Sequence, residues 1–304
     1  MKLRHELARD GVRPLVLAIG FFDGFHRGHR EVARQTLRRR KPGWRSGILT
    51  FANHPASHLR PGTEPPLIST ATERLELFAR AGFDECFFVQ FDEAVATLSP
   101  AEFLEILADR LHVRAVAVGA TFRFGHKREG DVAFMNEFLS KRGIEIVAVD
   151  PLCDGESRIS STRIRELIAE GETASADRLL GGTGYEVRGP VEVGAGRGHA
   201  LGFPTANVRL PSKLLPKDGV YAATARYDGR DYAALVSVGT NPQFGAGRRT
   251  VEAWLRDFHH TIYGHELALR DFRYLREQRL FAEVRELIEQ MQLDLQAIGY
   301  PSYG

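Results

Sequence analysis

The 304 residues carry 41 Lys and Arg against 39 Asp and Glu, so the formal net charge at pH 7 is only +2. This balance argues against a dedicated nucleic-acid surface, which usually shows a concentrated basic excess. The length suits two hydrophobic cores, and no apolar run approaches the roughly 20 residues that a membrane helix needs.

Three features of the sequence indicate where the chain works. Cys86 and Cys153 lie far apart and outside any metal-ligand spacing, which indicates a reducing compartment and no disulfide framework. Residues Met1 to Glu6 lack the apolar core of a signal peptide. The densest basic run, Arg38 to Lys41, fits the solvated end of a helix better than a nucleic-acid patch. We therefore expect a cytoplasmic protein without a membrane or nucleic-acid partner.

Strand and helix patterns alternate through the first half of the chain, which predicts a mainly parallel sheet with helices on both faces. One helix start is especially clear, because Ser99 can cap free amides, Pro100 suits the first helical position and Glu102 completes a capping box. We expect strands at 15–19, 47–51, 86–91, 115–118 and 144–149. We expect helices at 28–40, 72–81, from 99, at 132–142, at 160–171 and from 175.

The pattern changes after Gly181 and Gly182, and this glycine pair is the best domain boundary. Short apolar runs separated by turn residues follow, which predicts a small antiparallel β-barrel. We expect its strands at 185–188, 219–226, 232–238, 251–258 and 267–274, and a final amphipathic helix at 281–296. The predicted domains are therefore residues 1–182 and 183–304.

A loop rich in glycine and histidine, Gly20 to His29, directly follows the first apolar run. A strand that leads through such a loop into a helix N-terminus presents free amides and the positive end of the helix dipole to phosphate. His26 and His29 are three residues apart, so both can lie on one helix face and donate hydrogen bonds to phosphoryl oxygens. The same pair could instead bind zinc, although no cysteine or acidic cluster nearby completes such a site.

The pattern Gly20-x-Phe22-Asp23-Gly24-x-His26-x-Gly28-His29 resembles the signature of the prokaryotic bifunctional riboflavin kinase/FAD synthetases. Its His-x-Gly-His core is shared with the wider nucleotidylyltransferase superfamily, and the flanking Phe-Asp-Gly makes the match more specific. Further segments are similar to the family's in order and spacing: Thr50 to Pro55, Gly119 to Asp131 and Ile159 to Arg165. The sequence departs from the family pattern at Asn53, Thr121, His199 and Gln243.

This resemblance implies a nucleotidylyltransferase domain of Rossmann-like type that transfers an adenylyl group from ATP to FMN, giving FAD and pyrophosphate. It implies that His26, His29 and Arg165, with Mg²⁺, neutralise the charge that develops during transfer. The ATP- and phosphate-binding residues it implies are Gly20, Phe22, Asp23, Gly24, Gly28, Ser160, Ser161 and Thr162. The flavin-lining residues it implies are His54, Pro55, Phe122, Arg123, Phe124, Arg128 and Asp131.

In the second half, the segment from Gly194 to Asn207 ends in Pro-Thr-Ala-Asn and resembles the riboflavin kinase signature. The resemblance places Thr205 and Asn207 at Mg²⁺ and the ATP phosphates, and hydroxyl and amide oxygens are hard ligands that suit this ion. It identifies Glu252 as the general base for the riboflavin 5′-hydroxyl, although an alternating strand could equally turn this side chain to solvent. It places Arg276 beside the flavin. The alternative is that this arginine pairs with a neighbouring acidic residue. The ATP-binding residues it implies are Gly196, Gly198, Gly202, Pro204, Thr205 and Asn207.

The sequence thus predicts a bifunctional enzyme of flavin-cofactor biosynthesis. ATP is its co-substrate, riboflavin, FMN and FAD are its substrates and products, and the chain acts as a monomer or a weak homo-oligomer. Two alternatives stay open. The chain could be a flavin- or nucleotide-binding regulator with one or both catalytic sites silent, or a nucleotidylyltransferase fused to a barrel that binds RNA. The low net charge and the lack of an aromatic–basic groove pattern weigh against RNA.

Overall fold

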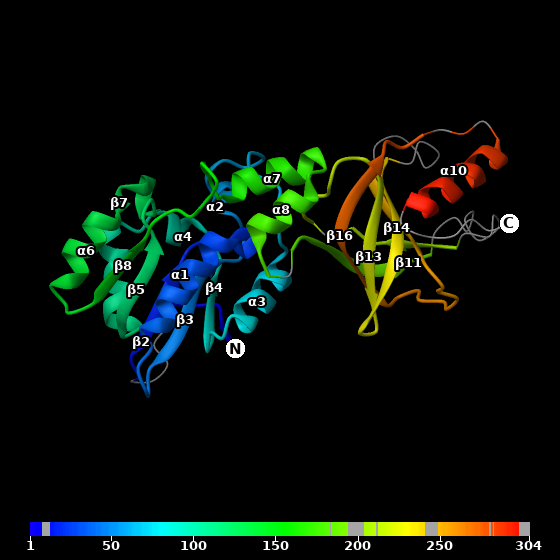
Figure 1. Ribbon diagram of the computed structural model, residues 1–304. Helices are drawn as coiled ribbons and strands as arrows, with labels where there is room; N and C mark the ends of the chain where they lie inside the picture. Colours follow the sequence, from blue (N-terminus) through cyan, green and yellow to red (C-terminus); the bar gives the residue numbers. More distant parts are fainter. Residues whose placement is uncertain are drawn as a thin grey trace. The chain divides into compact units, whose positions relative to one another are not determined.

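The computed structural model describes residues 1–7, 13–182, 184–193, 204–210, 212–240, 249–279, 281 and 283–297. The chain divides into two compact units, Met1–Ser161 and Thr162–Gly304 (Figure 1). The helices α7 (Ser161–Glu170) and α8 (Thr173–Leu180) fall almost entirely in the second unit. The boundary between the two compact units therefore precedes residue 182. The functional boundary at residue 182 remains a prediction.

The first unit is built on a six-stranded sheet in which all neighbouring strands are parallel. Its strand order is β1-β4-β3-β2-β5-β8. Every residue of β2 is buried, as expected for a central strand with helices on both faces. The strands are β1 (Lys2–Arg4), β2 (Leu15–Ile19), β3 (Arg45–Phe51), β4 (Glu85–Val89), β5 (Val113–Gly119) and β8 (Glu145–Val149).

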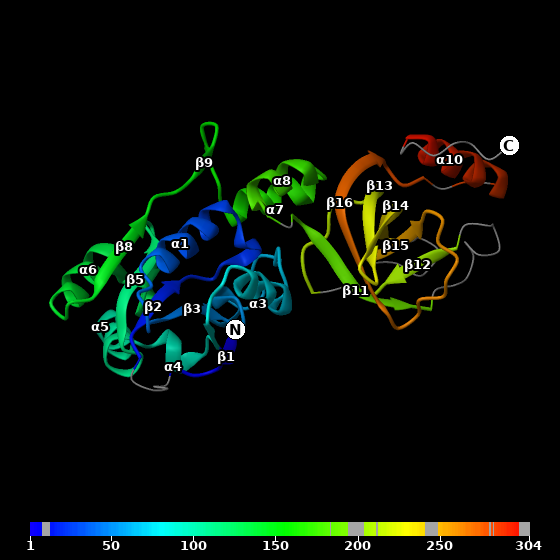
Figure 2. The same ribbon diagram turned by 60° about the horizontal axis from the view of Figure 1, so that its bottom comes forward.

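Helices cover both faces of this sheet, which confirms the predicted architecture (Figure 2). One face packs against α1 (Arg27–Arg38) and α3 (Ala71–Arg80), and Ala18, Ile48 and Phe88 point into that core. The other face packs against the remaining helices and receives the alternate side chains Leu17, Leu49 and Phe87. Those helices are α5 (Pro100–Glu105), the π-helical turn η2 (Ile106–Arg110) and α6 (Val132–Ser140).

The order of the strands creates a switch point between β2 and β5. From β2 the chain builds outward through β3 to β4, and it then returns to the other side of β2 with β5 and β8. The loops that leave the carboxyl ends of β2 and β5 therefore diverge from the same edge of the sheet. In open α/β sheets, ligands bind at such an edge, and the predicted phosphate loop starts there.

Several short elements were not predicted, because two to five residues are too few to show a period. The strand β1 is one of them, and it pairs with β4 at the edge of the sheet. The others in the first unit are η1 (Asp23–Phe25), α2 (Pro55–Leu59), α4 (Glu93–Ala96), β6 (Arg123–Phe124), η3 (His126–Arg128), β7 (Gly130–Asp131), β9 (Cys153–Asp154) and β10 (Ser157–Arg158).

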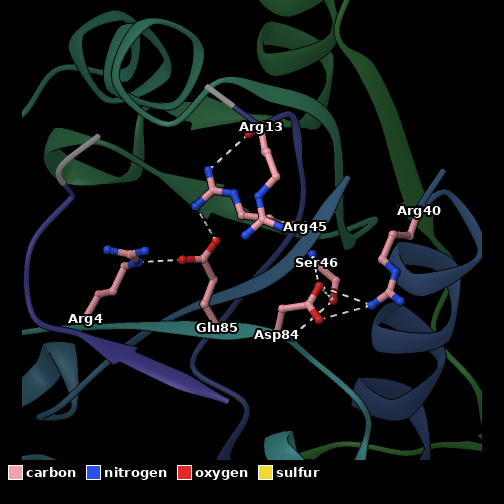
Figure 3. A network of polar contacts seen from close by, with 7 residues as sticks. All are labelled: Arg4, Arg13, Arg40, Arg45, Ser46, Asp84 and Glu85. Carbon is pink, nitrogen blue, oxygen red and sulfur yellow. Dashed lines mark hydrogen bonds and ion pairs between the residues drawn. The ribbon is translucent and has the colours of Figure 1, made fainter. Parts of the chain in front are cut away.

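Ion pairs connect the neighbouring strands β1, β4 and β3 (Figure 3). The buried Glu85 forms ion pairs with Arg4 of β1 and with Arg45 of β3. Its neighbour Asp84 accepts hydrogen bonds from the Ser46 amide at 2.7 Å and hydroxyl at 2.9 Å, and it pairs with Arg40 at 3.1 Å. Arg40, one of the four residues of the basic run 38–41, thus forms an ion pair within the unit.

The second unit contains a closed antiparallel barrel, as predicted, with strand order β11-β12-β15-β14-β13-β16. One strand, β12, was not expected, and β15 ends before residue 258 because the chain turns at Asp257, where φ is 52°. The strands are β11 (Glu186–Glu192), β12 (Thr205–Val208), β13 (Gly219–Tyr227), β14 (Arg230–Thr240), β15 (Arg249–Leu255) and β16 (Glu266–Arg276), followed by helix α10 (Val284–Ala297). Among the described helices, none has the length and apolar character needed to cross a membrane.

Candidate active sites

The loop after β2 has an unusual backbone that the sequence explains. Phe22 adopts a left-handed conformation with φ 58°, and Gly24 follows with φ 73°. The ring of Phe22 is buried against Phe25 and Phe78 and lies edge-on to His29. A buried aromatic anchor thus holds a strained turn directly before the helix α1, and such strain is typical of functional loops.

The two histidines of the loop lie face to face at the start of α1. Their ring centroids are 3.6 Å apart, with 18° between the ring planes. His26 caps the helix, because its Nδ1 accepts the backbone N–H of His29 at 3.3 Å. A Cβ on Gly28 would lie 3.2 Å from the His26 ring, so a larger residue here would push against that ring. The three-residue spacing therefore brings both imidazoles to the helix end that attracts phosphate.

The sequence did not predict the hydrogen bonds that the Asp23 side chain forms within the unit. Its carboxylate is buried and accepts hydrogen bonds from the amides of Ile68 and Ser69, each at 3.0 Å. The Ser69 hydroxyl in turn accepts the amide of Gly24 at 2.9 Å. Asp23 thus ties the phosphate loop to the segment before α3, and its direct contact with ATP stays a prediction.

The start of α7 also reaches this loop. The Ser161 hydroxyl donates to the carbonyl oxygen of Asp23 at 3.1 Å, although the two residues are 138 positions apart in the chain. Ser160 directly precedes Ser161 in the chain. Thr162 and Arg165 follow in α7 but belong to the second compact unit, so their position relative to the histidines stays a prediction.

The second motif forms a short helix beside the loop. His54 caps α2, because its Nδ1 accepts the Ala56 amide at 3.1 Å, and Pro55 takes the first helical position. The His54 ring lies edge-on to Phe21, with centroids 4.7 Å apart. Asn53 bridges to Phe91, donating to its carbonyl at 2.9 Å and accepting its amide at 2.8 Å. An asparagine at this position therefore fixes the turn by hydrogen bonds.

The third motif leaves the carboxyl end of β5. Phe122 and Phe124 stack with centroids 5.8 Å apart, and Phe124 is buried in the core. Arg123 pairs with Asp131 at 3.4 Å across the β6–β7 hairpin. Asp131 also caps α6, and Arg128 is exposed with φ 61°. Within this predicted flavin-lining set Phe124 packs in the core, and the flavin contacts of the whole set stay predictions.

Sequence reasoning missed one charged residue of the first unit, Arg74. Its side chain is fully buried in α3, and its guanidinium donates to the carbonyl oxygens of Phe21, Phe51 and Ala52. Burial lowers the pKa of Arg74, and the negative charge of Asp23 opposes that shift. A single arginine at a polar helix position gives no sequence signal that separates it from a solvent-exposed one.

In the barrel, the predicted kinase residues meet on one face. Asn207 of β12 lies directly opposite Glu252 of β15, and Ser237 of β14 lies on the other side of Glu252. Directly opposite residues of neighbouring strands share a face. Thr205 is two residues before Asn207, so its side chain points to the same face. Alternate residues of these strands are buried inside the barrel, which places Thr205, Asn207 and Glu252 on its outer surface.

Helix α10 is fastened next to these residues by Arg276 and Asp294. The guanidinium donates to the buried carboxylate at 2.9 and 2.6 Å, and Gln290 donates to it at 3.0 Å. Leu295 packs against Trp254, and Trp254 lies opposite Thr205. Arg276 therefore has the acidic partner that we considered as an alternative, and its contact with flavin stays a prediction.

The remaining predicted residues of the kinase site are Gly196, Gly198 and Gly202, which lie outside the described residues, as do His199 and Gln243. Pro204 lies directly before β12, and Thr121 accepts a hydrogen bond from Arg158 at 3.2 Å. Within the described parts of the chain, no group of three or more His, Cys, Asp and Glu side chains is arranged to hold a metal ion.

These two folds define a class of two-domain enzymes that transfer phosphorus-containing groups from nucleotides. The sequence model of the FAD synthetase family matches residues 9–163, and that of the riboflavin kinase family matches residues 181–299. The bifunctional riboflavin kinase/FMN adenylyltransferase of Listeria monocytogenes is 34% identical over 302 residues, with 97% of this chain and 95% of the relative covered. The chain belongs to the family of bifunctional riboflavin kinase/FMN adenylyltransferases.

Other relatives agree with this assignment. The proteins of the same name from Bacillus subtilis and Escherichia coli are 33% and 32% identical, over 97% and 95% of this chain and 95% and 93% of their own lengths. A crystal structure of a macrolide-efflux protein from Streptococcus pneumoniae has a TM-score of 0.84 and 28% identity, with 94% of each chain covered. The whole fold therefore recurs in a solved structure.

Proposed function

We propose that this chain converts riboflavin to FAD in two steps, with the barrel forming FMN and the parallel-sheet unit adenylylating it. The observation that carries the proposal is that some members of each predicted set come together within one unit. The histidines stack at a helix start beside the switch point of the sheet, and Asn207 lies opposite Glu252 in the barrel. We place the functional boundary near residue 182, with α7 and α8 in the adenylyltransferase half.

In the kinase step, the Glu252 carboxylate accepts the proton of the riboflavin 5′-hydroxyl as the hydroxyl attacks the γ-phosphorus of ATP, the bond to the β-phosphate oxygen breaks and ADP leaves. The Thr205 hydroxyl and the Asn207 amide oxygen lie on the same outer face of the barrel. Such oxygen donors fit Mg²⁺, and we propose that they hold this ion together with the ATP phosphates. Bound Mg²⁺ would neutralise charge on the transferred phosphoryl group.

In the adenylyl step, the FMN phosphate attacks the α-phosphorus of ATP and pyrophosphate leaves. The attacking group is already ionised, so the protein has no proton to remove and acts by positioning and by neutralising charge. We assign this task to the imidazoles of His26 and His29, which stack at the N-terminus of α1. We assign Arg165 to the same task, and we propose that the protein works in the cytoplasm as a monomer or weak homo-oligomer.

The test is to incubate the protein with riboflavin, ATP and Mg²⁺ and to separate the flavins by chromatography. Glu252→Gln should abolish FMN formation and leave the conversion of supplied FMN to FAD intact, and His29→Ala should do the reverse. The exposed residues Glu266 and His5 supply matched controls, Glu266→Gln and His5→Ala. Recovery of riboflavin alone from the wild-type protein would favour the regulator alternative. Loss of both activities in a folded single variant would contradict two independent sites.

A further inference from the structure

Arg74 is buried to an extent that neither proposed site explains. The side chain has no exposed surface. A buried guanidinium is costly unless its charge is compensated and its N–H groups are hydrogen-bonded. Here part of the compensation comes from backbone carbonyl oxygens, which accept from the terminal nitrogens: Phe21 at 3.1 Å, Phe51 at 3.0 Å and Ala52 at 3.3 Å. The Nε has no hydrogen-bond partner among the described residues.

These carbonyl groups belong to the two loops that carry the predicted motifs. Phe21 lies in the phosphate loop after β2, whereas Phe51 is the last residue of β3 and Ala52 begins the loop toward His54. The Phe21 ring also covers the guanidinium, with its centroid 4.5 Å from the Arg74 Cζ, and its edge contact with His54 extends this arrangement to α2. Arg74 thus joins the carboxyl ends of two neighbouring strands.

Further hydrogen bonds hold the phosphate loop to β3 and to the segment before α3. Thr50 donates to the Phe21 carbonyl at 2.9 Å, so this oxygen accepts two hydrogen bonds. Asp23 accepts the amides of Ile68 and Ser69, directly before α3 begins. The left-handed Phe22 therefore lies between two residues, Phe21 and Asp23, that are both tied to the α3 region.

We propose that Arg74 is a positioning residue for adenylyl transfer, which fixes the Phe21 backbone and through it the placement of His26 and His29. This inference rests on the proposed function of the first unit. Arg74 acts through the loop, since its guanidinium is enclosed by backbone and aromatic rings. A displacement of about 1 Å in a catalytic group can lower the rate about 100-fold, so the effect should be in kcat.

The test compares Arg74→Met and Arg74→Lys in the full chain. Methionine is apolar and has no donors, whereas lysine keeps the charge and donors. We expect Arg74→Met to lower kcat for the conversion of FMN to FAD by about 10- to 100-fold, with KM for ATP changed less than about 3-fold. Arg74→Lys should restore most of the rate. The matched control is Arg80→Met, at an exposed arginine of the same helix.

Riboflavin phosphorylation by the same molecules reports on their concentration and should stay within about 2-fold of wild type. Trp44 fluorescence reports on the folding of the first unit. If Arg74→Met does not fold, Thr50→Val decides, because it removes the other donor to the Phe21 carbonyl at nearly constant volume. We then expect a fall in kcat of about 3- to 10-fold. The inference is overturned if folded Arg74→Met forms FAD at the wild-type rate, or if Thr50→Val does so when Arg74→Met does not fold. Absence of FAD with the wild-type protein would instead refute the proposed function.

Discussion

The second unit should become less stable as the pH rises through about 6, because of Asp177. Its carboxylate, on α8, accepts the Tyr185 amide at 2.6 Å. Burial raises the pKa of Asp177 from 3.8 to about 6, and the charge of Asp271 adds to this, while the Tyr185 hydrogen bond opposes it. The folded state therefore binds a proton more tightly than the unfolded state. The contribution is fully present below about pH 3.8 and is lost as the pH rises through about 6.

The size of this effect follows from the shift. About two pKa units correspond to about 3 kcal/mol, and partial exposure of the side chain reduces this to about 1–2 kcal/mol through solvent screening. Asp177→Asn keeps an oxygen for the Tyr185 amide and carries no charge. At pH 7.5 it should raise the melting temperature by about 2–6 °C, and it should flatten the dependence of stability on pH between 4 and 7.

The assay can isolate the second unit, because the chain has two tryptophans, Trp44 in the first unit and Trp254 in the barrel. In a Trp44→Phe background, fluorescence of Trp254 follows barrel unfolding during thermal melts at several pH values. Asp228→Asn, at an exposed turn, is the control. A lower melting temperature for Asp177→Asn at pH 7.5, or an unchanged pH dependence, would refute the reasoning.

Three further predictions use the same chain. Gly28→Ala places a Cβ 3.2 Å from the His26 ring and should lower FAD formation about 10-fold, with FMN formation unchanged as the comparison. Ser99→Ala removes one half of the capping box at α5 and should lower the free energy of unfolding of the first unit by about 1 kcal/mol in denaturant titrations followed by Trp44 fluorescence; an unchanged midpoint would contradict this role. Asp294→Ala leaves Arg276 without its carboxylate, and melting of the barrel should show a loss of about 3 kcal/mol.

The sequence predicts most of the fold because long elements have clear periods. The alternation of Leu17 and Ala18 between two cores, and the burial of every residue of β2, follow from the apolar run itself. The strand β12 was missed, since four residues after a glycine-rich segment show no period. Its existence matters for the site, because it is what sets Asn207 opposite Glu252.

The site was predicted less completely, for a physical reason. Residue types and spacing indicate chemistry, but they do not show which polar groups turn inward. Asp23 resembles a ligand-binding residue in the motif, yet its carboxylate accepts backbone amides inside the unit. Arg74 resembles an ordinary polar position of a helix, yet it is fully buried. Tertiary hydrogen bonds between residues 22 or more positions apart orient both side chains.

The closure of the barrel limits how copies of this protein can associate. In the closed barrel each described strand is bonded on both sides, so the described strands of the barrel leave no free edge to which a further chain could add. The parallel sheet does end in two open strands, β1 and β8. β1 has only three residues, of which Lys2 and Arg4 are cationic, and short charged edges resist sheet-to-sheet aggregation. Among the described strands, addition between copies would therefore have to use β8 or one of the short hairpins β6–β7 and β9–β10.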